Sequence, residues 1–306
     1  MERPTEILDR SAKLTNKDRS TLSRHPWISI VLLVALLVFS LITTRLLIGG
    51  LMQLGVIFSP ITESLVGISV GILVYFGLVP YGLGLPQRRT SIREYMHTIG
   101  IRRPKSLTKA MILIVPCTAF LFLSWLLASL SYNYFVLGQN WAIFLDQLWT
   151  TSRAVPPQNW AMVTSLGVYL EEVIFRGILI KMLSERYSEH ATITLSAVAF
   201  GVVHLLNILN GPLSIELVIG VLAQIIFVSI YGLFYGYLFV KTGNLLPNII
   251  LHYIGNAFIS FFWYTPGASW PVYTILMLVF YIGPVPTILS IMWVKYASNR
   301  WCANEL

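Results

Sequence analysis

Long apolar segments dominate this sequence and restrict the folds that it can adopt. A helix that crosses the hydrocarbon core of a bilayer needs roughly 20 predominantly apolar residues. About eight segments meet this criterion, and they are 28–48, 60–83, 110–131, 160–182, 191–208, 214–240, 244–263 and 272–294. Of the 306 residues, 56% are hydrophobic and 11% are charged, whereas soluble domains carry about 25% charged residues. The sequence therefore predicts an all-α polytopic protein, multi-pass in the cell membrane.

The placement of basic residues predicts the orientation of these spans. Lys and Arg cluster before the first span and between the second and third, and smaller groups follow the fourth, sixth and eighth spans. The two main clusters comprise Arg10, Lys13, Lys17, Arg19, Arg24, Arg88, Arg89, Arg93, Arg102, Arg103, Lys105 and Lys109. By the positive-inside rule, both termini are expected in the cytoplasm, which agrees with an even number of spans. This placement accounts for the net charge of +8 without a nucleic-acid partner, so the expected surroundings are the lipid bilayer.

Composition divides the chain into four parts. They are a cytoplasmic tail at 1–27, the first three spans at 28–159 with a basic cytoplasmic loop at 86–109, spans four to seven at 160–263, and the last span with a cytoplasmic tail at 264–306. An apolar-polar pattern in the basic loop predicts a short interfacial helix around Ile92, Tyr95, Met96 and Ile99. The chemically reactive side chains gather in the third part.

Span four carries two adjacent carboxylates and a guanidinium near its middle, Glu171, Glu172 and Arg176. Ionisable groups at the centre of a span are costly and usually mark a functional site that faces the bundle interior. Glu172 and Arg176 are four residues apart and are expected to pair on one helical face. Glu171 points about 100° away from Glu172. We therefore expect Arg176 to neutralise Glu172 and to leave Glu171 free.

Spans five and seven add two histidines and several amides. His204 shares a helical face with Phe200 and Asn207. A polar stripe with a spacing of four residues in span seven consists of Asn248, His252 and Asn256. A single Asn or His in a span is more often an interhelical hydrogen-bonding residue, and a Glu–Arg pair alone can be structural. Their convergence on three nearby spans favours a functional site.

Three motifs in this order resemble those of the CAAX protease and bacteriocin-processing family, also called the Abi family. They are Glu171-Glu172-x-x-x-Arg176, Phe200-x-x-x-His204 and His252-x-x-x-Asn256. The similarity extends from about 160 to 260 and includes Gln224 and the turn Thr242-Gly243-Asn244-Leu245. Residues 160–263 are accordingly identified as the catalytic core.

The resemblance implies an intramembrane endopeptidase that cleaves a membrane-associated peptide or protein, either a prenylated CaaX protein or a leader-type peptide. It implies that Glu171 and His204 activate a water molecule and that His252 and Asn256 hold the oxyanion. Glu172, Arg176 and Phe200 would shape the site or contact the substrate. Preorganised donors of this kind contribute several kcal/mol in a dry site.

Three alternatives stay open at this point. Glu171, His204 and His252 form a His₂Glu set of the kind found in catalytic zinc sites. However, the short H-E-x-x-H spacing is missing and the family is understood as metal-free, so we expect no metal and no cofactor. The second alternative is a non-proteolytic immunity or regulatory protein of the same family. The third is a transporter, which also places ionisable groups in the membrane, but no repeat between the two halves is visible.

Overall fold

The computed structural model of the chain describes residue 22 and residues 25–87, 91–104, 106–146, 167–263 and 272–301. Within these ranges all regular structure is helical, which confirms the predicted all-α membrane fold. The basic residues up to Arg24, together with Arg88, Arg89 and Lys105, lie outside the described residues. The first residues of the predicted fourth span, 160–166, also lie outside them.

The first half contains α2 (Pro26–Gln53), α3 (Pro60–Ile72), the π-helical η2 (Leu73–Leu83), α4 (Ile92–Thr98) and α5 (Leu107–Phe135). Residues 141–146 are also helical. The second half begins with a helical segment, 167–183, whose middle part is the π-helical η3 (Val173–Leu179) and whose last turn is α8 (Ile180–Leu183). It continues with α9 (Glu189–Val203), the 3₁₀-helical η4 (His204–Asn210), α10 (Ile215–Thr242), α11 (Leu245–Trp263), α12 (Val272–Met277), the π-helical η5 (Leu278–Ile282) and α13 (Pro284–Trp301).

Among the described residues, six helical stretches are long and apolar enough to cross a membrane. They are Pro26–Gln53, Thr62–Leu83, Leu107–Phe135, Glu189–Leu209, Ile215–Thr242 and Ile275–Arg300. The predicted spans 160–182 and 244–263 correspond to the segment 167–183 and to α11, which are not among the six. Large apolar side chains such as Leu46, Leu73 and Phe280 are more than 70% exposed, as expected where lipid covers the surface. The chain is thus a multi-pass membrane protein, whereas eight spans and two cytoplasmic termini stay predictions.

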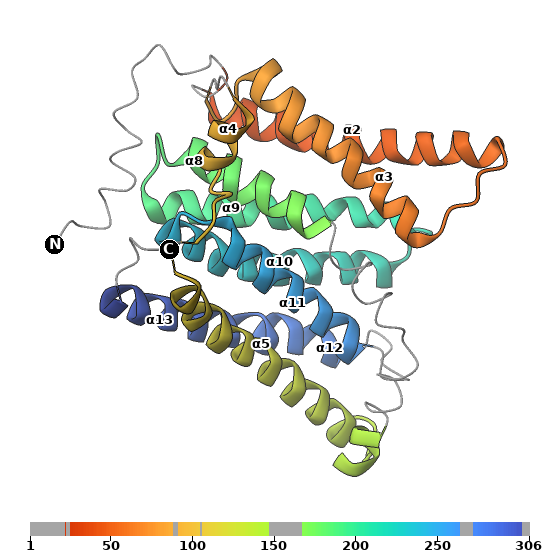
Figure 1. Cartoon of the computed structure of the whole chain (residues 1–306). Coiled ribbons are helices and arrows are strands. Elements are labelled where there is room, and N and C mark those ends of the chain that lie inside the picture. Colours follow the sequence, from red (N-terminus) through yellow and green to blue (C-terminus); the bar gives the residue numbers. More distant parts are fainter. Residues whose placement is uncertain are drawn as a thin grey trace.

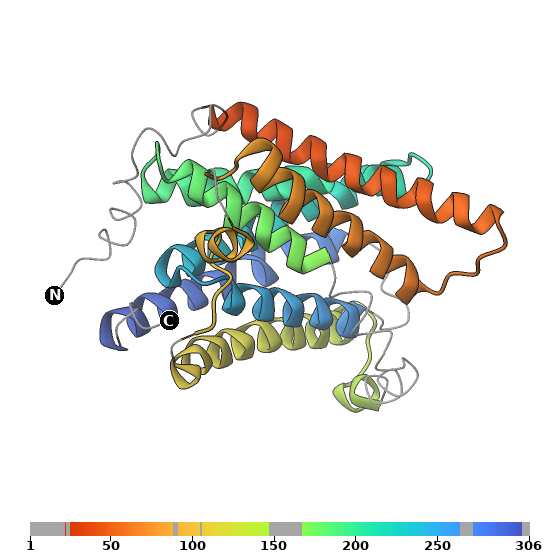
Figure 2. The same cartoon turned by 45° about the horizontal axis from the view of Figure 1, so that its top comes forward.

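The helices form a layered bundle with α9, α10 and α11 in its middle (Figures 1 and 2). In both views α2 and α3 lie along one edge of the bundle, and α5 lies at the opposite edge beside α13. One apolar core packs α5, α10, α11 and α13 together. A second core joins α2, η2 and α4 to the segment 167–183. Helix α10 contributes side chains to both cores, so it connects the two halves of the bundle.

Glycines allow α9 and α10 to approach each other closely. A Cβ atom added at Gly232 of α10 would lie 2.9 Å from Ala197 Cα in α9. A Cβ atom added at Gly201 of α9 would lie 2.8 Å from the carbonyl oxygen of Ile225 in α10. Both obstacles are backbone atoms, which cannot rotate away. The contact therefore requires glycine at these two positions, as is common where helices pack in lipid.

The change Gly232→Ala is expected to lower the stability of the protein by about 1–3 kcal/mol, the usual cost of overpacking a filled interior. Thermal unfolding in detergent micelles would measure the loss as a lower Tm. Gly49→Ala in α2 is the matched control, because nothing lies within 4 Å of a Cβ atom at that position. An equal Tm for the two variants would show that α9 and α10 are not in close backbone contact.

The basic loop contains a helix where the sequence predicted one, α4. Its apolar face differs from the prediction, however, because Tyr95 and Ile99 are fully buried in the protein and do not face lipid. The Tyr95 hydroxyl donates to the carbonyl oxygen of Tyr75 at 2.7 Å. Just beyond α4, the carbonyl oxygen of Gly100 accepts from the Leu245 backbone N–H at 2.8 Å. This loop therefore fixes the start of α11, on which His252 and Asn256 are carried.

Candidate active site

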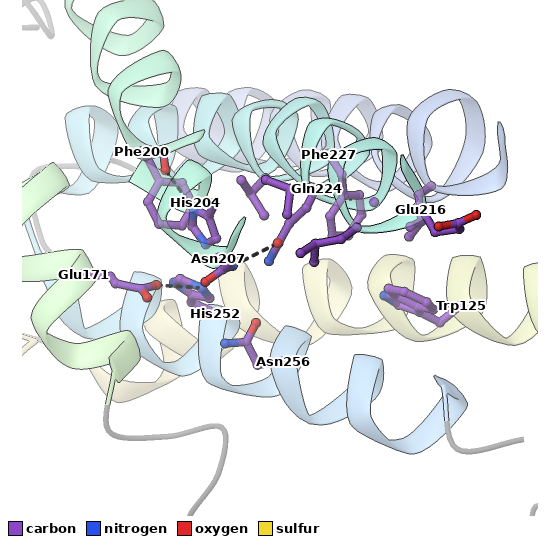
Figure 3. Close-up of a pocket in the computed structure, with 15 residues that line it drawn as sticks. Trp125, Glu171, Phe200, His204, Asn207, Glu216, Gln224, Phe227, His252 and Asn256 are labelled. Carbon is purple, nitrogen blue, oxygen red and sulfur yellow. Dashed lines mark hydrogen bonds and ion pairs between the residues drawn. The ribbon is translucent and has the colours of Figure 1, made fainter. Parts of the chain in front are cut away.

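A cavity of ≈ 610 Å³ brings together side chains from the three motifs (Figure 3). Glu171 reaches it from the segment 167–183, His204 from the junction of α9 and η4, and His252 and Asn256 from α11. The rest of the lining is mainly apolar and includes Trp125, Leu217, Val221, Phe227, Val228 and Leu278. The structure thus places all four predicted catalytic residues on the wall of one cavity.

Behind the cavity, Glu172 is held by three hydrogen-bond donors. Arg176 Nη1 donates to its Oε1 at 3.0 Å, and both side chains are fully buried. Asn248 Nδ2 donates to Glu172 Oε2 at 3.3 Å, and His252 Nδ1 lies 2.7 Å from Glu172 Oε1. A buried carboxylate requires pairing of this kind, because an unpaired charge in the interior is very costly. The predicted Glu172–Arg176 pair is confirmed.

Aromatic rings enclose the Arg176 guanidinium. Its central carbon lies 4.3 Å from the ring centroid of Phe200 and 5.3 Å from that of Tyr235, within the range of cation–π attraction. Phe200 is 2% exposed and also contacts the ring of His204 edge-on at a centroid distance of 5.0 Å. Phe200 is thus buried between Arg176 and His204 and also lines the cavity, so its structural and substrate-binding roles both stay predictions.

His252 lies between the two glutamates. A carboxylate oxygen only accepts, so the contact with Glu172 places a hydrogen on His252 Nδ1. Its other nitrogen, Nε2, is 3.6 Å from Glu171 Oε2. The ring of Tyr235 stacks on the imidazole at a centroid distance of 5.0 Å. As expected, Arg176 pairs with Glu172 and not with Glu171, and the packing of α11 brings His252 close to Glu171.

His204 stands at the point where α9 changes into the 3₁₀-helix η4. Its Nδ1 lies 2.9 Å from the carbonyl oxygen of Phe200, and a carbonyl oxygen only accepts, so Nδ1 carries the hydrogen. In the neutral ring Nε2 then has the free electron pair and can accept a proton. Residues three apart eclipse each other in a 3₁₀-helix, which explains why Asn207 lines the same cavity as His204.

Two residues of the site were missed or only partly understood from the sequence. Asn248 was part of the predicted polar stripe, but its hydrogen bond to Glu172 and a second one to the carbonyl oxygen of Tyr235 at 2.7 Å were not predicted. Tyr235 itself was not singled out. Its position in the apolar span six offers no signal, since a buried tyrosine ring looks like any other core residue.

The zinc alternative was also compared with the structure. Within the described ranges, no group of three or more His, Cys, Asp or Glu is placed to hold a metal ion. Glu171, His204 and His252 line one cavity. Nδ1 of each histidine contacts an oxygen of the protein, which leaves Nε2 of each ring, and metal-ligating histidines commonly show the same arrangement.

Comparison with known proteins agrees with the motifs. Residues 153–258, about a third of the chain, match a family model described as type II CAAX prenyl endopeptidase Rce1-like. The matched stretch contains all seven residues singled out in the three motifs, and it confirms the resemblance predicted from them. At the level of the family, the match supports a membrane endopeptidase acting in a lipid environment. No curated protein and no solved structure matched the chain.

Proposed function

We propose that this chain is an intramembrane endopeptidase that hydrolyses a peptide bond in a membrane-associated peptide or protein. The observation that carries the proposal is the cavity itself. It brings the carboxylate of Glu171, the imidazoles of His204 and His252 and the amide of Asn256 together on one wall whose lining is mainly apolar. Hydrolysis of an amide needs a base for water and donors for the oxyanion, and these four side chains supply both.

Glu171 and His204 are the residues that we propose to activate the water. The Glu171 side chain is 31% exposed, in contrast to the fully buried Glu172, so water and substrate can reach it. A water molecule between Glu171 and His204 Nε2 would lose a proton to one of them as its oxygen attacks the carbonyl carbon. The same proton then passes to the leaving amine nitrogen, so that the carbon–nitrogen bond breaks and the base is regenerated.

His252 and Asn256 are the proposed oxyanion donors. Nε2 of His252 can donate to the oxyanion only when it carries a hydrogen, that is, when the ring is doubly protonated. Glu172 Oε1 lies 2.7 Å from Nδ1 of this ring, and Glu171 Oε2 lies 3.6 Å from its Nε2. Asn256 lies one helical turn beyond His252 and lines the cavity with it. Glu172 and Arg176 would act from behind by holding His252 in position.

A comparison of two strains would test the proposed function in the cell. Membrane peptides would be profiled by mass spectrometry in a strain that lacks this protein and in one that carries Glu171→Ala. If the chain is a protease, both strains should accumulate the same uncleaved peptides. If the Glu171→Ala strain behaves like wild type while the deletion strain does not, the chain acts without catalysis, as an immunity or regulatory protein would.

Cleavage by the purified protein is expected to continue after metal chelation. The proposed mechanism uses only side chains, so incubation with EDTA or 1,10-phenanthroline should change kcat by less than about twofold. A quenched-fluorescence peptide with a farnesylated CaaX end, and its unprenylated counterpart, would serve as substrates in liposomes. Loss of activity that returns on adding Zn²⁺ would contradict the metal-free mechanism and favour the His₂Glu alternative.

A further inference from the structure

Two amide side chains in the cavity have no role in the proposed chemistry. Asn207 Nδ2 of η4 donates to Gln224 Oε1 of α10 at 2.9 Å, and both residues line the cavity together with His204 (Figure 3). The apolar neighbours Phe227 and Trp125 lie on the same wall. An amide side chain beside apolar residues is costly unless it is hydrogen-bonded. The Asn207–Gln224 bond satisfies one group of each amide, and the role of the pair in the cavity is still to be explained.

A purely structural role between helices explains the pair poorly. The contact between α9 and α10 is already made at short range by Gly201 and Gly232, and the amide pair lies beyond it, where α9 has given way to η4. Asn207 and Gln224 are only partly buried. The hydrogen bond lies where η4 packs against α10, but both side chains also line the cavity, where a ligand can reach them.

The hydrogen bond also determines which end of Gln224 can meet a ligand. It uses the carbonyl oxygen of the side chain, and the amide nitrogen Nε2 points into the cavity (Figure 3). An NH₂ group has two hydrogens to donate. Asn207 therefore holds Gln224 in the orientation that presents a donor, and the natural acceptor in a peptide is a main-chain carbonyl oxygen.

The distance from the reaction centre can be estimated along η4. A 3₁₀-helix rises about 2.0 Å per residue, so the backbones of His204 and Asn207 are roughly 6 Å apart along its axis. An extended peptide advances about 3.3 Å per residue. The carbonyl that Gln224 can reach thus lies about two or three residues from the bond that is cut.

From this geometry we infer that Gln224 is a substrate-binding residue whose Nε2 donates to a main-chain carbonyl of an extended substrate, with Asn207 as its positioning residue. The inference rests on the proposed function and deepens it. Recognition through the main chain would fix the register of the peptide in the site without selecting one side chain. The apolar wall beside Gln224 would then accept apolar substrate side chains.

Binding of a farnesylated CaaX peptide with a fluorescent N-terminus would test this inference. The measurement uses the Glu171→Gln protein in nanodiscs, so that the peptide stays intact. Adding Gln224→Met, which keeps the length of the side chain but removes the donor, is expected to raise Kd about 3- to 10-fold, the value of one hydrogen bond. Asn207→Ala should weaken binding in the same direction. Gln87→Met is the matched control, because Gln87 also bonds a side chain, that of Glu185, but does not line the cavity.

A series of peptides, each with one amide replaced by an ester, would identify the acceptor, because an ester carbonyl accepts hydrogen bonds more weakly. We expect one ester, two or three residues from the scissile bond, to weaken binding to the Glu171→Gln protein and to have no further effect once Gln224→Met is present. If Gln224→Met leaves Kd unchanged, or if every ester acts equally with and without it, the inference is overturned. If the wild-type protein does not cleave the peptide but binds it in a Gln224-dependent way, the proposed function is wrong. The assignment of Gln224 as a substrate-binding residue is then still supported.

Discussion

Replacing Glu171 with glutamine is expected to lower kcat for peptide cleavage by about 10²–10⁴-fold, the contribution typical of a positioned base. Glutamine keeps the size of the side chain but cannot take a proton from water. The KM should change little, because the proposed role of Glu171 concerns the water and not the peptide. His204→Ala should cause a loss of similar size, since His204 is the second residue proposed to activate the water. The readout is hydrolysis of the farnesylated CaaX peptide by protein in liposomes.

Glu63→Gln is the appropriate control for this experiment. Glu63 is an exposed carboxylate in the first turn of α3, and its loss removes the same charge from the protein without touching the cavity. Its activity should equal that of wild type. If Glu171→Gln and His204→Ala both retain full activity, the proposed mechanism is wrong, whatever the chain does in the cell.

The second large effect is expected at Arg176, on stability as well as activity. Arg176→Met would leave Glu172 as a fully buried carboxylate without its cationic partner. Breaking a buried pair in this way costs about 3–5 kcal/mol, so the Tm in detergent should fall sharply. The double variant Glu172→Gln with Arg176→Met removes both charges and should recover part of that loss. Activity should stay low in the double variant, because it lacks the carboxylate that lies 2.7 Å from His252 Nδ1.

Lys241→Met supplies the comparison for Arg176→Met. Lys241 Nζ lies 2.6 Å from Glu189 Oε1, but the two side chains are 18% and 25% exposed. Solvent-exposed ion pairs contribute only about 0–1 kcal/mol, so this variant should lose little. An equal fall in Tm for the two variants would show that the buried Glu172–Arg176 pair contributes no more to stability than the Lys241–Glu189 pair, which would contradict this prediction.

Helical periodicity predicted those parts of the site that lie within one helix. Glu172 and Arg176 are four residues apart, and their pairing followed from that spacing alone. The polar stripe of α11 was likewise visible as a period of four. The different tasks of its members were not visible, because the contacts of Asn248 and His252 with Glu172 depend on how α11 packs against the segment 167–183. Contacts between residues more than 70 positions apart in sequence cannot be predicted from helical periodicity.

The sequence also did not predict where the helices depart from regular α-helical geometry. Hydropathy detects an apolar segment long enough to span a bilayer, and it is indifferent to whether the hydrogen bonds run to the fourth or the fifth residue. The π-helical turns of η2, η3 and η5 and the 3₁₀ turn of η4 were therefore not predicted. At η4 the 3₁₀ turn keeps Asn207 on the face of His204 that the helical period predicted, and both line the cavity.

The π-helix η3 has a consequence for how such a chain can evolve. It begins directly after Glu172 and ends where the buried turn Ile180–Leu183 continues the helix. Removing or adding one residue within it would turn everything on one side by about 100° relative to the other. Either Glu171 would leave the cavity and Glu172 its buried pair with Arg176, or the buried turn would face lipid. Length changes among homologous proteins should therefore be found in connections such as 184–188 or 211–214, and not between Glu171 and Leu183.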